Sequence, residues 1–168
     1  MKLKRIALVA VFSQVLALTA FAQKILVDSD SSVDFSKFKT YAWRTGTPAP
    51  SPLMDQRVIA AINTQMASKG FVKVDADKNP DLIITYHAAV DYETQITSTG
   101  YYYYGGGTTY VDKIPVGTLL VEMDDPATHK VVWRGQGSDT MSDKPDKIAK
   151  KINQVAEKMF KKYPPEKK

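Results

Sequence analysis

The sequence predicts an α+β fold, a two-layer sandwich in which a mainly antiparallel sheet carries two helices on one face. Two amphipathic helix patterns, at residues 51–70 and 142–162, stand among short segments rich in β-branched and aromatic residues. Each helix pattern has one apolar stripe, and packing both stripes on one face of the sheet buries them together. The 168-residue chain shows no internal repeat and no second domain.

Residues 1–22 have the three-part pattern of a cleavable signal peptide. A basic start is followed by an apolar stretch over residues 6–18, and Ala20-Phe21-Ala22 supplies the small-x-small cleavage pattern. A retained membrane anchor is the alternative, but a span needs about 20 apolar residues. We therefore expect cleavage between Ala22 and Gln23, which leaves one α+β domain over residues 23–168.

The composition narrows the chemistry of the domain. There is no cysteine, which excludes thiol catalysis, disulfides, thiolate metal sites and lipid attachment through an N-terminal cysteine. The formal net charge of +5 falls to about +2 once the three basic residues of the signal segment are removed. So small a charge gives no reason to propose nucleic acid as a partner. We expect a soluble periplasmic or secreted protein.

The first half of the chain reads as two strands and a helix. Residues 25–34 begin with a short strand and end in a turn, and residues 39–44 form a second strand rich in aromatic residues. Ser51 is a suitable N-cap, with proline at the next position, and Lys69-Gly70 is a typical helix end. The apolar face of this helix consists of Val58, Ile59, Ile62 and Met66.

The second half reads as further strands and a closing helix. Residues 81–90 give the strongest strand pattern, and the strand is expected to continue to Ile96. Its Leu-Ile-Ile start predicts a central place in the sheet. Before this strand, residues 71–74 are expected to be extended and residues 75–80 to form a polar turn. Residues 98–109 are predicted to be a hairpin loop rich in Gly and Tyr. Further strands are expected at 116–124 and 130–137, where they form a hairpin. The last helix, expected to be capped by Ser142 or Asp143, buries Ile148, Ile152, Val155, Met159 and Phe160.

Five segments of the chain carry a recognisable pattern: residues 34–43, 81–87, 117–124, 131–135 and 163–165. Together they resemble the bacterial envelope family known as domain of unknown function 4136. The resemblance covers nearly the whole predicted mature chain and keeps the order of the pieces. It implies an exported protein, often a lipoprotein, in a family without an assigned activity, cofactor or catalytic residue; the missing cysteine departs from the lipoprotein form.

Neither histidine stands in a recognisable catalytic pattern. His87 lies in the central strand and His129 beside a hairpin turn, and neither has the nucleophile and orienting carboxylate that a triad requires at a suggestive spacing. Asp28, Asp30 and Asp34 alternate like calcium ligands but lack the glycine and distal glutamate of an EF-hand loop. We interpret all five residues as structural and expect no metal, nucleotide or other cofactor.

Two further features are interpreted as structural. Trp133 is expected in the core and Arg134, on the opposite face of the strand, beside a carboxylate. The lysines from Lys144 to Lys168 alternate with an apolar stripe, which is typical of the solvated face of a helix. They allow at most peripheral contact with acidic lipid.

The one candidate contact site is the run Tyr101, Tyr102, Tyr103 and Tyr104 between glycines. Aromatic surface combined with backbone freedom is typical of binding loops, although a loop tip without a partner is the simpler alternative. We therefore expect an exported envelope protein acting as a non-catalytic binding or structural module. Its partner would be an envelope protein, lipid or cell-wall component, and its oligomeric state is open. The alternative is a hydrolase-type periplasmic enzyme with an unrecognised active site.

Overall fold

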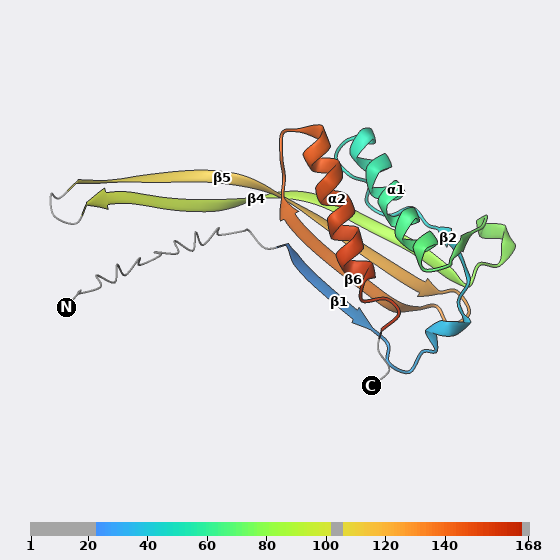
Figure 1. The fold of residues 1–168 in the computed structure, drawn as a ribbon. Helices are drawn as coiled ribbons and strands as arrows, with labels where there is room; N and C mark the ends of the chain where they lie inside the picture. The colour runs from blue at the N-terminus through green and yellow to red at the C-terminus, as the bar shows by residue number, and fades with distance from the viewer. Residues whose placement is uncertain (1–22, 102–105, 166–168) are drawn as a thin grey trace, which may run out of the picture.

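Two helices lie side by side across one face of a mixed β-sheet (Figure 1). The structure, a computed structural model, describes residues 23–101 and 106–165, so the predicted signal segment 1–22 lies outside it. The predicted two-layer α+β fold is confirmed. The elements are β1 (Lys24–Ser29), β2 (Thr40–Trp43), α1 (Pro52–Ser68), β3 (Val72–Lys73), β4 (Leu82–Tyr101), β5 (Gly106–Asp125), β6 (Lys130–Thr140) and α2 (Pro145–Phe160), with 3-10 helices at Phe35–Lys37 and Ala76–Lys78.

Within the described residues, six strands form one sheet in the order β1-β6-β5-β4-β2-β3. The pairs β1–β6, β6–β5 and β5–β4 are antiparallel, whereas β4–β2 and β2–β3 are parallel. The parallel pairs follow from α1, which carries the chain from β2 back across the sheet before β3 and β4. The first strand therefore pairs with the last, with Lys24 opposite Ser138.

The core lies between the helices and the sheet face that they cover. Alternate residues of β4, β5 and β6 point into it, as the period of two in a strand requires. Trp133 and Phe160 are fully buried, with ring centroids 5.3 Å apart. The other large side chains that are almost completely buried are Ile62, Met66, Leu82, Ile84, Val121, Met123, Val132 and Met159.

The helix ends agree only in part with the sequence prediction. The Ser51 hydroxyl accepts from Met54 N at 3.3 Å, and Gly70 has a φ of 84° just after α1, both as expected. The predicted cap of α2 was wrong. Its N-cap is Lys144, because Pro145 occupies the first helical position, and Ser142 instead accepts from Lys144 N at 3.2 Å.

The predicted hairpin loop over residues 98–109 was also wrong in extent. Strand β4 continues to Tyr101 and β5 already begins at Gly106, so the two strands stay paired up to Tyr101 opposite Gly106. The threonines on either side of the glycines, with Ile96 before and Val111 after them, favour extended backbone, which the loop composition obscured. The residues between these two strand ends, 102–105, lie outside the described residues.

Candidate functional site

The outer half of the β4–β5 hairpin projects from the sheet as a two-stranded arm (Figure 1). Strand β6 makes its last pair with β5 at Val116, and on the other side of β4 the last bridge joins Thr47 to His87. Beyond these points, among the described residues, β4 and β5 pair only with each other, apart from one backbone hydrogen bond at the root, from Met141 N to Pro115 O at 2.6 Å. We define the arm as residues 91–101 of β4 and 106–115 of β5. Its two outer edges carry backbone groups that are unpaired in the sheet.

Large apolar side chains are exposed on the arm. Tyr92, Ile96, Val111 and Tyr110 are 68%, 66%, 62% and 55% exposed. All side chains at residues 91–98 and 109–113 are exposed. Such a cluster on a segment that makes no core is typical of a contact surface.

The register divides the arm into two faces of different character. On the helix side, Tyr92 stands opposite Pro115 and Ile96 opposite Val111, so this face carries three of the large exposed apolar side chains. The pairs between and beyond them, Thr94 with Lys113 and Ser98 with Thr109, are polar. We call this the apolar face. The other face carries Asp91, Glu93 with Ile114 opposite, Gln95 with Asp112 opposite, and Thr97 with Tyr110 opposite. We call it the acidic face.

Of the tyrosine run that the sequence singled out, the structure describes only the first residue. Tyr101 is the last residue of β4, while Tyr102, Tyr103 and Tyr104 lie outside the described residues. Their role as a contact remains a prediction. The sequence analysis did not predict the arm, although Ile96, Tyr110 and Val111 lie among residues that favour strands and were a signal for it.

A small apolar pocket of about 60 Å³ lies at the base of the arm, between the helix N-termini and the sheet. Its walls include Met54, Leu119, Met141 and Ile152. This volume is enough for a few waters and too small for a metabolite-sized ligand. We assign it no ligand.

An ion pair closes the polar side of this pocket. Lys151 Nζ lies 3.0 Å from Asp139 Oδ1 and also donates to Thr140 O at 2.6 Å. Asp139 accepts from Gln23 Nε2 at 2.7 Å as well. Burial alone would raise the pKa of Asp139, but the bonds from Gln23 and Lys151 outweigh it and hold that pKa below its usual value. The pair therefore ties β6, α2 and the start of β1 together.

A second, more polar cavity of about 590 Å³ opens at the far end of the sheet, between Lys37, Asp81 and Asp125. Both carboxylates are already satisfied. Asp81 accepts from the backbone of Lys39 and of Thr40 at 2.8 Å each, and Asp125 accepts from Ala127 N at 2.9 Å and from Lys37 Nζ. These groups hold turns in place.

The two histidines occupy structural positions. His87 lies on β4, where Nδ1 is 2.8 Å from the Thr47 hydroxyl, so it fastens the segment before α1 to the sheet. No hydrogen bond from His87 to a carboxylate occurs within residues 23–101 and 106–165. His129 has a φ of 54° in the turn between β5 and β6, as expected for a turn residue.

The alternating aspartates near the N-terminus serve the local backbone. Asp28 and Asp30 accept from the backbone N–H of Ser29 and Ser32 at 2.9 Å each, and Asp34 caps a 3-10 helix through Ser36 N at 3.1 Å. In the part of the chain that the structure describes, no cluster of three His, Asp or Glu side chains could hold a metal ion.

The remaining predicted positions fall as expected. Trp133 is fully buried, and Arg134 on the opposite face lies with Nε 3.5 Å from Glu122 Oε1. Lysines 147, 150, 158 and 161 of the C-terminal region are exposed, whereas Lys151 is held by Asp139.

Among the helices described, none is long and apolar enough to cross a membrane.

Comparison with known proteins places these features in a family and a fold. The sequence profile of the family described as "Domain of unknown function (DUF4136)" matches residues 25–165. A crystal structure of a DUF4136 family protein from Bacteroides thetaiotaomicron superposes with a TM-score of 0.55 at 16% identity, over 84% of this chain and 96% of that one. A search of curated proteins found no match.

Two further crystal structures share the fold. PelC from Paraburkholderia phytofirmans, a dodecamer, gives a TM-score of 0.55 at 13% identity, over 82% of this chain and 94% of that one. A PDZ domain protein from Parabacteroides distasonis gives 0.57 at 17% identity, over 87% of this chain. The chain spans 36% of the length of that last protein. At these identities the likeness concerns the fold alone.

Proposed function

Since the chain belongs to the DUF4136 family, whose profile matches residues 25–165, we propose that it is a non-catalytic binding module of the bacterial cell envelope. The arm is its contact surface. The partner is an envelope protein, a lipid surface touched only peripherally, or a cell-wall component.

The arm is the observation that carries this proposal. A two-stranded hairpin is marginally stable by itself in water, and this one exposes Tyr92, Ile96, Tyr110 and Val111 while contributing nothing to the core. Exposed apolar surface and free strand edges are a liability unless a partner covers them. Binding to the arm supplies that cover.

The placement of the ionisable groups supports a non-catalytic role. A hydrolase needs a nucleophile, a base and an orienting group within hydrogen-bond reach of each other. Here His87 bonds to Thr47, and Asp30, Asp81 and Asp125 satisfy backbone donors in turns. Each of these groups already has a structural task.

The envelope location rests on the signal-peptide pattern of residues 1–22 and on the family resemblance. Cleavage after Ala22 would start the mature chain at Gln23, immediately before β1. Without cysteine, the protein would lack the lipid anchor of lipoproteins and would remain periplasmic or be secreted.

Co-purification after gentle cross-linking in the native host tests the proposal. The wild type is compared with Ile96→Ser/Val111→Ser on the apolar face, and with a variant in which Tyr101–Tyr104 are serine. The control is Val72→Ser, which removes a similarly exposed apolar side chain from the edge strand β3, outside the arm.

We expect a partner that the wild type and Val72→Ser capture and that at least one arm variant loses. Loss only with the serine run would place the contact at the tyrosines. Equal capture by all four proteins would exclude the arm as the contact surface. No captured partner at all would count against the binding module.

A further inference from the structure

We propose that the acidic face of the arm in one copy docks on a row of lysines along α2 in a second copy of the chain. This inference rests on the proposed function, because it takes the arm as the contact surface and names the partner. Each copy would offer its arm to one neighbour and its helix to another, which gives a head-to-tail assembly.

The arm contributes a line of negative charge. Asp91, Glu93 and Asp112 share the acidic face and are all exposed, and the register places Asp112 two pairs beyond Glu93. With a rise of about 3.3 Å per residue, the three carboxylates extend over about 13 Å. The one lysine nearby, Lys113, stands opposite Thr94 on the apolar face.

Helix α2 contributes a complementary line of positive charge. Lys147, Lys150, Lys158 and Lys161 recur at three, eight and three positions, which keeps them on one side of a helix with 3.6 residues per turn. All four are exposed and extend over about 21 Å at 1.5 Å per residue. We call them the lysine row.

The row keeps its charge although two acids flank it. Asp146 and Glu157 are exposed beside it, while Lys151 is turned inward to Asp139 and does not contribute. Four lysines against two acids leave the helix surface positive. The row is also long enough to face all three carboxylates of an arm.

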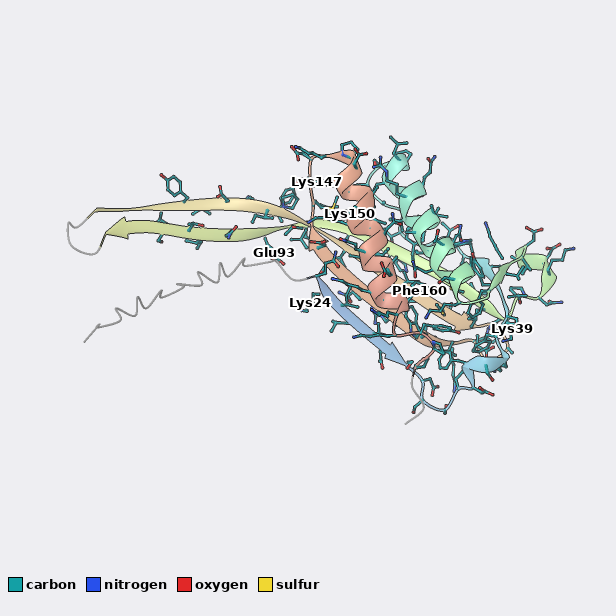
Figure 2. The ribbon with its side chains drawn as sticks, viewed as in Figure 1. Lys24, Lys39, Glu93, Lys147, Lys150 and Phe160 are labelled. Atoms are coloured by element: carbon teal, nitrogen blue, oxygen red, sulfur yellow. The ribbon has the colours of Figure 1, made fainter. Side chains whose placement is uncertain are left out.

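The two charged lines do not satisfy each other within one chain. In the described residues no ion pair joins Asp91, Glu93 or Asp112 to a lysine of the row. Figure 1 shows the arm leading away from the helices, and Figure 2 shows Glu93 at its root with Lys147 and Lys150 on α2. Both lines of charge are therefore available to another molecule.

The signs of these charges favour a second copy of the chain over a membrane as the binding partner. An anionic lipid surface attracts basic segments and repels carboxylates. An anionic membrane would thus repel the acidic face of the arm and attract the lysine row. A second copy accounts for both lines of charge at once.

A charge-swap experiment tests the docking directly. Protein produced from the full sequence is compared with an arm variant, Glu93→Lys/Asp112→Lys, and a helix variant, Lys147→Glu/Lys150→Glu. Sedimentation equilibrium measures the mass at about 0.05 M and about 0.5 M salt, since screening over a few ångströms removes exposed ion pairs. Circular dichroism shows that each variant is folded.

The expected result has three parts. The wild type associates at low salt, and high salt raises its dissociation constant at least about tenfold. Each variant alone is monomeric, because its arm and its helix then carry the same sign. Mixing the two variants restores a complex, because the basic arm of one meets the acidic helix of the other.

Three results would overturn the inference: a monomeric wild type at low salt, a wild-type mass retained by both variants, or a mixture that stays monomeric. Each is separate from the proposed function, which is judged by capture of a partner in the host. A monomeric protein whose arm variant loses another envelope partner would leave that function standing.

Discussion

The indole of Trp133 covers Gly135, which lies two residues further along β6 on the same face of the sheet. A methyl group on Gly135 would come within 2.5 Å of Cη2 of the ring. The ring is fully buried and rests on Phe160, so it has no room to withdraw. The glycine is therefore required by the tryptophan.

Gly135→Ala should lower the free energy of unfolding by about 1–3 kcal/mol, the usual effect of overpacking a core. Urea denaturation measures it. The control is Gln136→Ala on the opposite face of the same strand, which should stay within about 0.5 kcal/mol. Equal stability of Gly135→Ala and the wild type would show that the ring can yield.

Asn63 of α1 joins the helix to β2 through one oxygen. Its Oδ1 accepts from Tyr41 Oη at 2.8 Å and from Trp43 Nε1 at 3.0 Å. Asn63→Leu should lower the free energy of unfolding by about 1–3 kcal/mol, because it strips two donors of their acceptor. Asn63→Asp retains an oxygen at this position and should lose less. A denaturation series in which both variants lose equally would contradict this explanation.

The ion pair of Lys151 with Asp139 should make stability depend on acid. The folded state holds the pKa of Asp139 below its ordinary value, so its contribution is present above about pH 4 and disappears as the pH falls through the folded pKa. Asp139→Asn should lower the free energy of unfolding by about 1–3 kcal/mol at neutral pH. It should also flatten the decline of stability in acid.

Thermal unfolding between neutral pH and strong acid measures both effects. Asp143→Asn removes an exposed carboxylate of the nearby loop and serves as the control. An unchanged acid slope in Asp139→Asn would mean that the pair does not contribute.

Because of Tyr86, the free energy of unfolding should fall at high pH. Burial, followed by the hydrogen bond and charge of Asp55, raises the pKa of its phenol well above the ordinary value. In the unfolded chain the phenol of Tyr86 loses its proton near pH 10, whereas in the folded protein it is still protonated at that pH. The free energy of unfolding therefore falls as the pH rises above about 10. Tyr86→Phe should be less stable at neutral pH and should lose less on going to high pH. The control is Tyr92→Phe, an exposed phenol on the arm.

The arm should be separable from the domain. Replacing residues 94–113 by Asn-Gly joins Glu93 to Ile114, which already face each other, through a turn that suits a two-residue hairpin. Because the described side chains among the removed residues, 94–98 and 109–113, are all exposed, the free energy of unfolding should change by less than about 1 kcal/mol. Calorimetry and size-exclusion chromatography measure stability and association together. A large loss of stability would contradict this prediction and show that the arm contributes to the core.

Local rules predicted the elements that local interactions determine. The cap at Ser51, the positive φ at Gly70 and the burial of Trp133 all follow from neighbouring residues. The arm was missed because the glycines and tyrosines of residues 98–109 were interpreted as a loop and the next strand was expected only from residue 116. Pro115 lies just beyond the last β5–β6 pair at Val116, where an edge tolerates proline.

The strand order and the candidate site depend on distant partners. The hydrogen bonds that tie β2 to Asn63 cross an intervening loop, and the pair of Gln23 with Asp139 spans 116 positions. No period or motif in the sequence specifies such contacts. The projection of the arm could likewise be seen only once the end of β6 at Thr140 was known.

Pairing of β1 with β6 has a consequence for the order of events during folding. Strand β1 is the first to be synthesised, yet its partner, Lys130–Thr140, is among the last. During most of synthesis β1 has no strand to pair with, and it can join the edge of the sheet only when almost the entire chain has been made. Contacts this distant in sequence slow folding, because a long loop must close before they form. A chain interrupted after Asp125 would contain β2, β4 and β5 but would leave β1 without a place in the sheet.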